Sequence, residues 1–193
     1  MTIAHQRHIT EQDYLSHELD SQNRHEYVNG EIFAMTGASA AHNLISGNLY
    51  TALMQHLKGK TCRPYMADMK LKIGTDYFYP DVLVDCAELA DDAHFTQSPI
   101  LIVEVLSKST KSYDKTFKMQ RYQQIASLQE YVLIEHDIAE VEVLRKSQHW
   151  QPSYYYLGDR FNLESVKLEL DVSDIYDRIK NDDMLQWLAK KSI

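Results

Sequence analysis

The stretch Ile100-Leu101-Ile102-Val103-Glu104-Val105-Leu106 carries the strongest structural signal in this chain. It is rich in β-branched residues and lies between Pro99 and the polar run Ser107–Thr110, a pattern that predicts a strand buried on both faces. Glu104 interrupts the apolar run. Because an unpaired buried carboxylate is costly, Glu104 must be compensated by a metal ion, a lysine or a hydrogen-bond network.

A second apolar strand is predicted upstream, at Tyr79–Asp85, with Asp81 at its entry. Side chains at i and i+2 share one face of a strand, so Glu104 shares its face with Leu106. If Asp81 lies opposite Glu104 on the neighbouring strand, both carboxylates can reach one Mg²⁺-sized ion. The alternative is that Glu104 forms a structural ion pair with an arginine or lysine of the core.

Length and composition place the chain in a general class. Its 193 residues are most simply one domain, residues 1–193, and 44% hydrophobic with 25% charged residues is ordinary for a globular protein. No apolar run reaches the roughly 20 residues of a membrane span, and the N-terminus lacks the apolar core of a signal peptide. Cys62 and Cys86 stand in no metal-ligand or redox spacing. We therefore expect a cytoplasmic protein with reduced thiols and no membrane partner.

The charge is unevenly distributed. A net charge of −8 argues against indiscriminate nucleic-acid binding. Between Glu104 and Arg121, however, five bases face two acids, a local balance of +3. A phosphate-facing role and a solvated helix face both remain open for these bases, which are Lys108, Lys111, Lys115, Lys118 and Arg121.

The remaining pattern predicts a mixed order of elements without repeats. Asn29-Gly30 supplies the turn of a hairpin over Glu26–Phe33, and Ser39 is placed to cap a helix over Ala41–Leu57. Tyr65–Ile73 alternates as one strand, and Ala87–Ser98 has the composition of a loop. The other expected elements are helices at Thr10–His17, at Asp114–Ala126 and from Ser173 onward, and strands at Tyr131–Ile134, Val141–Leu144, Ser153–Leu157 and Val166–Leu170.

With these residues in place, the chain resembles the PD-(D/E)XK nuclease superfamily. More specifically, it is similar to the Uma-type restriction endonuclease family, formerly a domain of unknown function. The resemblance covers roughly Tyr14 to Ile179. It rests on an ordered series: the Tyr27–Glu31 hairpin, Gly37-Ala38-Ser39 with His42-Asn43, Asp68-Met69, Tyr79-Pro80-Asp81, Ile102–Ser107, and Tyr113-Asp114 leading to Lys118 and Tyr122.

The resemblance implies a restriction-endonuclease-like fold of the α/β (α+β) class, a central mixed sheet flanked by helices. Asp81 and Glu104 match the two acids of the motif, but its usual lysine, two residues after the glutamate, is Leu106 here. The superfamily is known to move this lysine onto the following helix. Lys118 is the natural substitute, and Asp114 would hold it at i, i+4.

Two alternatives remain for these lysines. The Asp114–Lys118 pair can instead be a surface salt bridge worth under ~1 kcal/mol. Lys108, at the exit of the strand, is a second candidate for the catalytic cation. Further residues have possible supporting roles, namely Glu26, Glu31, His42, Asp68, Asp114 and Tyr122.

The sequence thus predicts a Mg²⁺-dependent (or Mn²⁺-dependent) DNA endonuclease, with Asp81 and Glu104 as metal ligands and Lys118 as the assisting cation. By resemblance, a twofold homodimer is expected. The alternative is a nuclease fold that has lost turnover and serves nucleic-acid binding or assembly, which Leu106 and the acidic net charge favour. A hydrolase of small phosphoesters is a third possibility.

Overall fold

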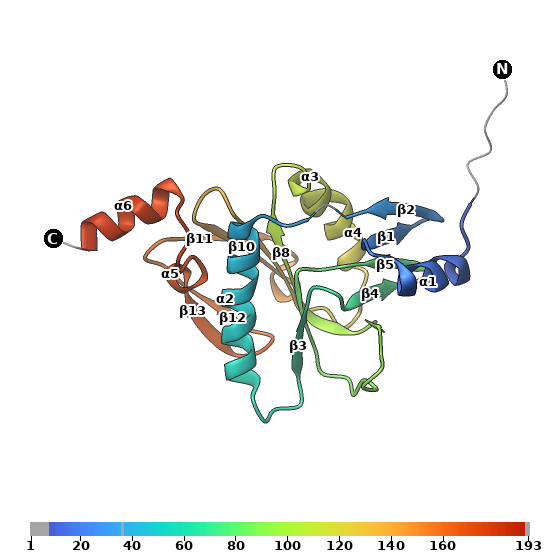
Figure 1. Cartoon of the computed structure of the whole chain (residues 1–193). Coiled ribbons are helices and arrows are strands. Elements are labelled where there is room, and N and C mark those ends of the chain that lie inside the picture. Colours follow the sequence, from blue (N-terminus) through green and yellow to red (C-terminus); the bar gives the residue numbers. More distant parts are fainter. Residues whose placement is uncertain (1–7, 36, 192–193) are drawn as a thin grey trace, which may run out of the picture.

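The computed structural model describes residues 8–35 and 37–191, so the N-terminal residues that the signal-peptide expectation concerned lie outside its description. In the described part of the chain, no helix is long and apolar enough to cross a membrane. The helices are α1 (Glu11–Asp20), α2 (Ala40–Leu57), α3 (Lys111–Tyr113), α4 (Met119–Tyr122), α5 (Val172–Ile175) and α6 (Asp182–Lys191), with a π-helical turn at Asp114–Lys118 and a 3-10 turn at Lys146–Gln148 (Figure 1).

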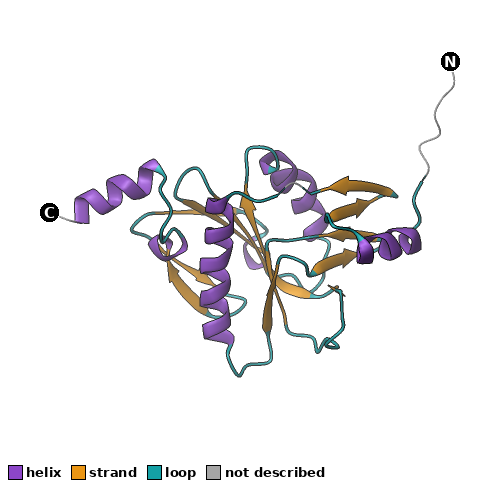
Figure 2. Cartoon of the chain, in the orientation of Figure 1, coloured by secondary structure: helices purple, strands orange, loops and turns teal. Residues whose placement is uncertain are grey.

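A mixed six-stranded sheet forms the centre of the fold, in the order β11-β10-β9-β8-β6-β3. Only β8 and β9 run parallel to each other; the other neighbours are antiparallel. The predicted central mixed sheet with flanking helices is confirmed (Figure 2). Its strands are β3 (Arg63–Met66), β6 (Val82–Asp85), β8 (Pro99–Leu106), β9 (Glu130–Glu135), β10 (Glu140–Arg145) and β11 (Pro152–Tyr156).

Two smaller sheets complete the architecture. A five-stranded sheet in the order β2-β1-β5-β4-β7 contains the N-terminal hairpin, and a two-stranded sheet lies near the C-terminus. Their strands are β1 (His25–Val28), β2 (Glu31–Ala34), β4 (Lys70–Ile73), β5 (Asp76–Phe78) and β7 (Phe95–Thr96), then β12 (Arg160–Leu163) and β13 (Leu168–Asp171).

The β8 strand is buried on both faces, as its composition predicts. Val103 packs in the core that contains Leu49 of α2, whereas Ile102 packs in the core that contains Tyr122 of α4. Each fully buried aliphatic side chain contributes roughly 1.5–3 kcal/mol of transfer free energy. The alternation of the strand therefore sends Glu104 to the side of α4, together with Ile102.

Two local predictions are confirmed with their physical causes. Asn29 and Gly30 adopt φ values of 51° and 84°, the left-handed geometry that joins β1 to β2 in a tight hairpin. The Ser39 side chain accepts a hydrogen bond from the backbone N–H of His42 and caps α2. These two elements fix the hairpin and the first turn of α2 beside the entry of β6.

Three element predictions need correction. Tyr65–Ile73 is not one strand: β3 and β4 belong to different sheets, and the chain turns at Ala67, whose φ is 55°. The alternation continues across that turn, so the pattern alone hides it. The expected loop Ala87–Ser98 contains β7, which pairs in parallel with β4. The expected helix Asp114–Ala126 starts earlier, at Lys111 in α3, continues as a π-helical turn over Asp114–Lys118 and ends at Tyr122.

The prediction of reduced thiols is wrong in this structure, where Cys62 and Cys86 form a disulfide. The strands explain the pairing: β3 and β6 are antiparallel with Arg63 opposite Asp85, so the two cysteines meet one residue beyond that pair. Their Cα atoms are 3.8 Å apart. Because the partners are 24 residues apart in the sequence, no local spacing signals the bond.

Candidate active site

Asp81 is the residue just before β6, and the alternation of β6 and β8 directs the side chains of Asp81 and Glu104 to the same face of the central sheet. β6 and β8 are antiparallel with Val82 opposite Val103, and the next pair in this register is Asp81 with Glu104. Directly opposite residues place their Cβ atoms roughly 4.5–5.5 Å apart. The Val105 N–H also donates a 2.7 Å hydrogen bond to Asp81 Oδ2, which fixes the aspartate against β8.

The side chain of Lys118, at the end of the π-helical turn Asp114–Lys118, reaches this cluster. Its Nζ lies 3.1 Å from Glu104 Oε1 and 2.9 Å from Glu26 Oε1, and it lies 3.4 Å from Asp114 Oδ1. The side chain is 7% exposed, so this is a buried cluster and the surface-salt-bridge alternative is wrong. The alternative in which Glu104 forms an ion pair with a lysine of the core matches the observed contact. That lysine is Lys118, which is also the predicted catalytic cation.

The local structure places Lys118 at the buried cluster, while Leu106 occupies the usual position of the motif lysine. Asp114 and Lys118 are the two ends of a π-helical turn, and both are buried on the side that faces the sheet. Leu106 packs instead in the apolar core with Leu128 and Tyr122, so this position belongs to packing. Insertions of this kind are frequent at functional sites.

The electrostatics of the cluster are unbalanced toward negative charge. Glu104, Glu26 and Asp114 contact one ammonium, and Asp81 adds a fourth carboxylate near Glu104. Burial raises the pKa of Glu104 well above its usual value, and the neighbouring carboxylates add to the rise while Lys118 opposes it. Burial alone would lower the pKa of Lys118, but Glu104, Glu26 and Asp114 raise it well above its usual value. Lys118 is therefore a permanent cation, and the carboxylates favour a second one.

Hydrogen bonds leave oxygen atoms of the two motif acids available. Glu104 Oε1 accepts from Lys118 and, at 2.9 Å, from the Tyr122 hydroxyl, but Oε2 accepts none from the described residues. Asp81 Oδ2 accepts from Val105 N–H and faces His42, and Oδ1 has no such partner among them. Hard carboxylate oxygens of this kind suit Mg²⁺ or Mn²⁺.

These two acids make an incomplete shell by themselves. Within residues 8–35 and 37–191, no group of three or more His, Cys, Asp or Glu side chains is arranged to hold a metal ion. Magnesium usually binds through one or two carboxylates and completes its shell with water and substrate phosphates. The donor set therefore fits a substrate-assisted Mg²⁺ site and does not fit a closed structural site.

His42 also contacts the site, at Asp81. Its Nε2 lies 3.2 Å from Asp81 Oδ2, from the first turn of α2. Burial alone would lower the pKa of His42, but the hydrogen bond and charge of Asp81 raise it above its usual value. His42 is thus placed to hold Asp81 in position, a contact the sequence raised only as a possibility.

A cavity of about 770 Å³ opens over these residues. Lys108 lines it with a side chain that is 89% exposed, 3.7 Å from Asp137. His136, which sequence reasoning missed, also lines it and bonds the Leu106 carbonyl oxygen at 2.6 Å through Nδ1. The signal was available: β8 and β9 are parallel, so residues that follow them meet at one edge of the sheet.

Two predicted supporting residues lie elsewhere. Glu31 is exposed on β2 and does not line the cavity, whereas Glu26 on β1 does. Asp68 pairs with Arg24 at 3.0 Å, and its side chain is 71% exposed. Asp114 and Tyr122 are at the site, as described above. The hairpin therefore contributes one acid, and the structure chooses Glu26.

Most of the predicted basic cluster is neutralised within the chain. Lys111 contacts Glu135, Lys115 contacts Glu142, and Arg121 contacts Asp76. Lys118 is occupied by the buried acids. Lys108 is the most exposed of these bases: its side chain is 89% exposed, lines the cavity and lies 3.7 Å from Asp137.

Comparisons with known proteins concern the family and the fold of the chain. The sequence model of the Uma2 family, described as "Putative restriction endonuclease", matches residues 11–173. Uncharacterized protein slr1290 of Synechocystis sp. is 35% identical over 173 residues, covering 87% of this chain and 91% of that protein. Uncharacterized protein sll1609 of the same organism is 36% identical over 155 residues, covering 76% and 85%.

The fold has a solved counterpart. A crystal structure described as a putative nuclease belonging to DUF820, from Anabaena variabilis, superposes with a TM-score of 0.75 over 89% of this chain and 99% of that one. Sequence identity is 18%, so this likeness concerns the fold alone. The sequence match over most of the chain shows that it belongs to the Uma2 family of restriction-endonuclease-like proteins, which confirms the resemblance seen in its motifs.

Proposed function

We propose that this protein is a Mg²⁺- or Mn²⁺-dependent DNA endonuclease that hydrolyses phosphodiester bonds. The observation that carries the proposal is the position of Lys118 Nζ, 3.1 Å from Glu104 Oε1, beside the opposed pair Asp81 and Glu104. Two acids and a buried cation meet at one cavity although the motif lysine is missing from its usual position. Family membership supports the same activity.

Each residue has a distinct proposed role. Asp81 and Glu104 would hold the metal through Oδ1 and Oε2, and the bound ion would supply Lewis-acid activation of water and charge stabilisation at the phosphate. Lys118 carries a fixed positive charge that would stabilise the negative charge developing on the phosphate during attack by water. Tyr122 and Glu26 position that machinery, because the tyrosine donates to Glu104 Oε1 and Glu26 contacts Lys118.

A second candidate function is favoured by a specific observation. The internal pairing of Lys111, Lys115 and Arg121 leaves few free cations for the phosphate backbone of DNA. Combined with a net charge of −8, this suits an inactive nuclease fold that serves binding or assembly. The opposed acids and Lys118 favour the enzyme, since a binding module has no use for a buried carboxylate cluster that demands a cation.

The deciding experiment is a cleavage assay on supercoiled, linear and single-stranded DNA with Mg²⁺, Mn²⁺ or Ca²⁺. Turnover is expected with Mg²⁺ and Mn²⁺, and little with Ca²⁺, whose larger and looser shell positions water poorly. Cleavage of small phosphodiesters but of no DNA would indicate the small-phosphoester hydrolase instead. DNA binding without cleavage in any metal would establish the binding module.

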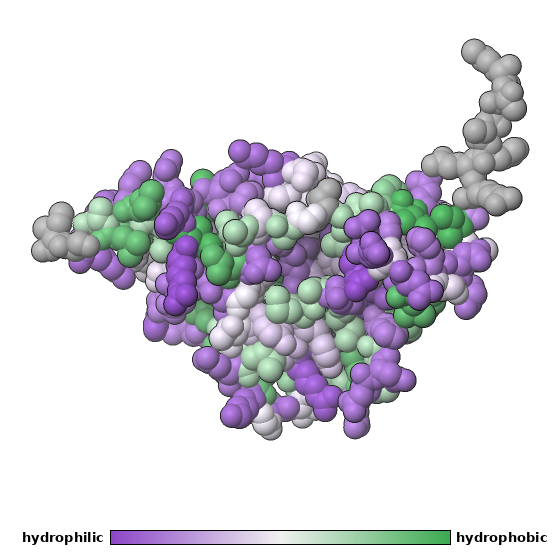
Figure 3. Space-filling model, viewed as in Figure 1, coloured by the Kyte–Doolittle hydropathy of each residue, from purple (hydrophilic) through white to green (hydrophobic). Residues whose placement is uncertain are grey.

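We also propose that the active form is a twofold homodimer. Double-strand cleavage needs two scissions, and a closed twofold dimer supplies two sites. Hydrophobic residues gather on α6 at the left of Figure 3, where Leu185 is 54% exposed. Light scattering should give about twice the chain mass of 22.5 kDa at micromolar concentration, and a mass of 22.5 kDa would contradict the dimer.

A further inference from the structure

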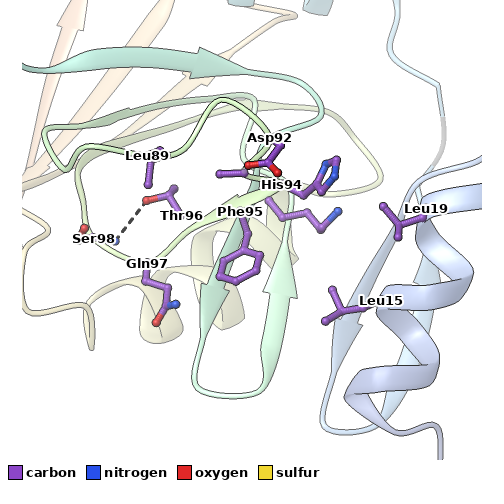
Figure 4. A pocket seen from close by; sticks show the side chains of 11 residues that line it. Leu15, Leu19, Leu89, Asp92, His94, Phe95, Thr96, Gln97 and Ser98 are labelled. Atoms are coloured by element: carbon purple, nitrogen blue, oxygen red, sulfur yellow. Dashed lines mark hydrogen bonds between the residues drawn. The ribbon is translucent and has the colours of Figure 1, made fainter.

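A second cavity, of about 550 Å³, lies between α1 and the segment that carries β7. It shares no lining residue with the cavity of the acidic cluster. Figure 4 shows Leu15 and Leu19 of α1 facing Leu89 and Phe95 across the space. Its volume falls in the range of roughly 300–1,000 Å³ that is typical of small-molecule sites.

Lys70 brings a positive charge to these apolar walls. It is the first residue of β4, and its backbone is fixed against the β7 segment by pairing with Phe95 and by a 3.3 Å hydrogen bond to the His94 carbonyl oxygen. Only 6% of the residue is exposed. The Nζ atom of Lys70 lies over the Tyr79 ring, 5.6 Å from its centroid. It forms no hydrogen bond or ion pair with the described residues.

The nearby acids do not neutralise Lys70 directly, because they are engaged elsewhere. Glu18 accepts hydrogen bonds from the Tyr79 hydroxyl and from both the backbone and the ring of His25. Asp68 is paired with Arg24. Burial lowers the pKa of Lys70 below its usual value, which records the cost of an ammonium without a direct counter-ion. A bound anion would offset that cost.

We propose that this cavity binds a small amphiphilic monoanion, an apolar carboxylate whose headgroup pairs with Lys70 and whose body lies between Leu15, Leu19 and Phe95. The apolar walls select the body and the single buried ammonium selects the charge. Asp92, exposed at the lining of the same cavity, disfavours a second negative charge on the ligand. This site does not depend on the nuclease activity proposed above.

The test is calorimetric titration of the whole protein with octanoate, alongside 1-octanol, acetate and octyl phosphate. Saturable one-to-one binding of octanoate is expected. The other three ligands should bind at least tenfold more weakly, since 1-octanol lacks the charge, acetate lacks the apolar body and octyl phosphate carries excess charge. Amide resonances of residues in α1 and β7 should shift on addition of octanoate.

Two variants isolate the contacts. Lys70→Met should weaken octanoate at least tenfold while leaving 1-octanol unchanged, and Leu15→Asp should weaken both. Lys180→Met, at an exposed lysine, is the matched control and should change neither. Octanoate binding that survives Lys70→Met undiminished, equal affinity for octanoate and 1-octanol, or absence of octanoate binding to the wild type would each overturn the proposal.

Discussion

Lys118 Nζ lies 3.1 Å from Glu104 Oε1, although the lysine follows the glutamate by 14 residues and comes from a π-helical turn. If this ammonium replaces the missing motif lysine, Lys118→Gln should reduce Mg²⁺-dependent cleavage at least 100-fold, because the variant removes the charge that stabilises the transition state. A 100-fold loss corresponds to about 2.7 kcal/mol. The measurement is single-turnover cleavage at saturating DNA.

Lys108→Ala is the matched control for that variant. Its side chain is 89% exposed and lies outside the buried cluster, so turnover at saturating DNA should stay within about twofold of the wild type. Lys118→Arg keeps the charge but not its compact geometry, and should stay folded with low activity. Full activity in Lys118→Gln together with loss in Lys108→Ala would transfer the role to Lys108.

Substitution of Glu104 should affect cleavage and DNA binding differently. Glu104→Gln should remove cleavage while DNA binding is kept or improved, because a neutral amide replaces a carboxylate near the phosphates. Tyr122→Phe removes one hydrogen bond from Glu104 Oε1 and should cost about tenfold in rate without abolishing it. Gel-shift titration and cleavage on the same DNA measure both effects; cleavage that persists undiminished in Glu104→Gln would falsify the assignment.

The sequence predicted the central part of the site because its signals are local. The apolar run around Glu104 predicts β8, and the antiparallel pairing with β6 then sets Asp81 opposite Glu104. The charge of Glu104 demands a partner, and the sequence offers Lys118 and Lys108, which both follow it in the chain, as candidate cations. The pairing of β6 with β8 therefore brings two locally predicted strands, and the acids that they carry, together at one site.

What the sequence could not predict depends on long-range geometry. The split between β3 and β4 turns on one positive φ at Ala67, which leaves the alternation intact. The disulfide follows from the β3–β6 pairing, and the choice of Glu26 over Glu31 follows from which end of the hairpin faces the site. A π-helical turn differs from an α-helix by one residue per turn, which composition does not encode.

The disulfide makes a prediction for solution chemistry. Without reductant, the folded chain should show no reactive thiol from Cys62 or Cys86, and two after reduction and unfolding. Opening a crosslink over 24 residues should lower the free energy of unfolding by about 3 kcal/mol. Thiol titration and urea unfolding with and without reductant measure these effects. Two reactive thiols in the untreated native protein would contradict the bond.

DNA binding should depend on salt through few contacts. Each neutralised phosphate contributes about −0.9 to the slope of log K against log salt. Lys108→Ala should therefore reduce the slope by about one, whereas Lys111→Ala should change it less, because Lys111 forms a 2.5 Å ion pair with Glu135 and the contact of Lys108 with Asp137 is 3.7 Å. Equal slopes for the two variants would show that the internal ion pair opens on DNA.

The buried charge of Lys70, in the second cavity, should lower the free energy of unfolding. Its folded pKa lies below the usual 10.5, so between the two values the unfolded chain binds more protons and stability rises with pH. Well below both pKa values Lys70 is protonated in both states, and the burial cost of its charge is fully present. Lys70→Met should therefore raise Tm at pH 7, because it removes the burial cost of the ammonium.

The same variant should lose its advantage in alkaline solution. As pH rises above 10.5, Lys70 is neutral in both states and the burial cost of its charge disappears, so the Tm difference between Lys70→Met and the wild type should shrink toward zero. Lys180→Met, exposed in the folded chain, should show no difference at either pH. Thermal melts of the three proteins at pH 7 and pH 11 provide the comparison. A Tm gain that is equal at both values would mean that Lys70→Met acts through packing, and that burial of the charge is not what destabilises this site.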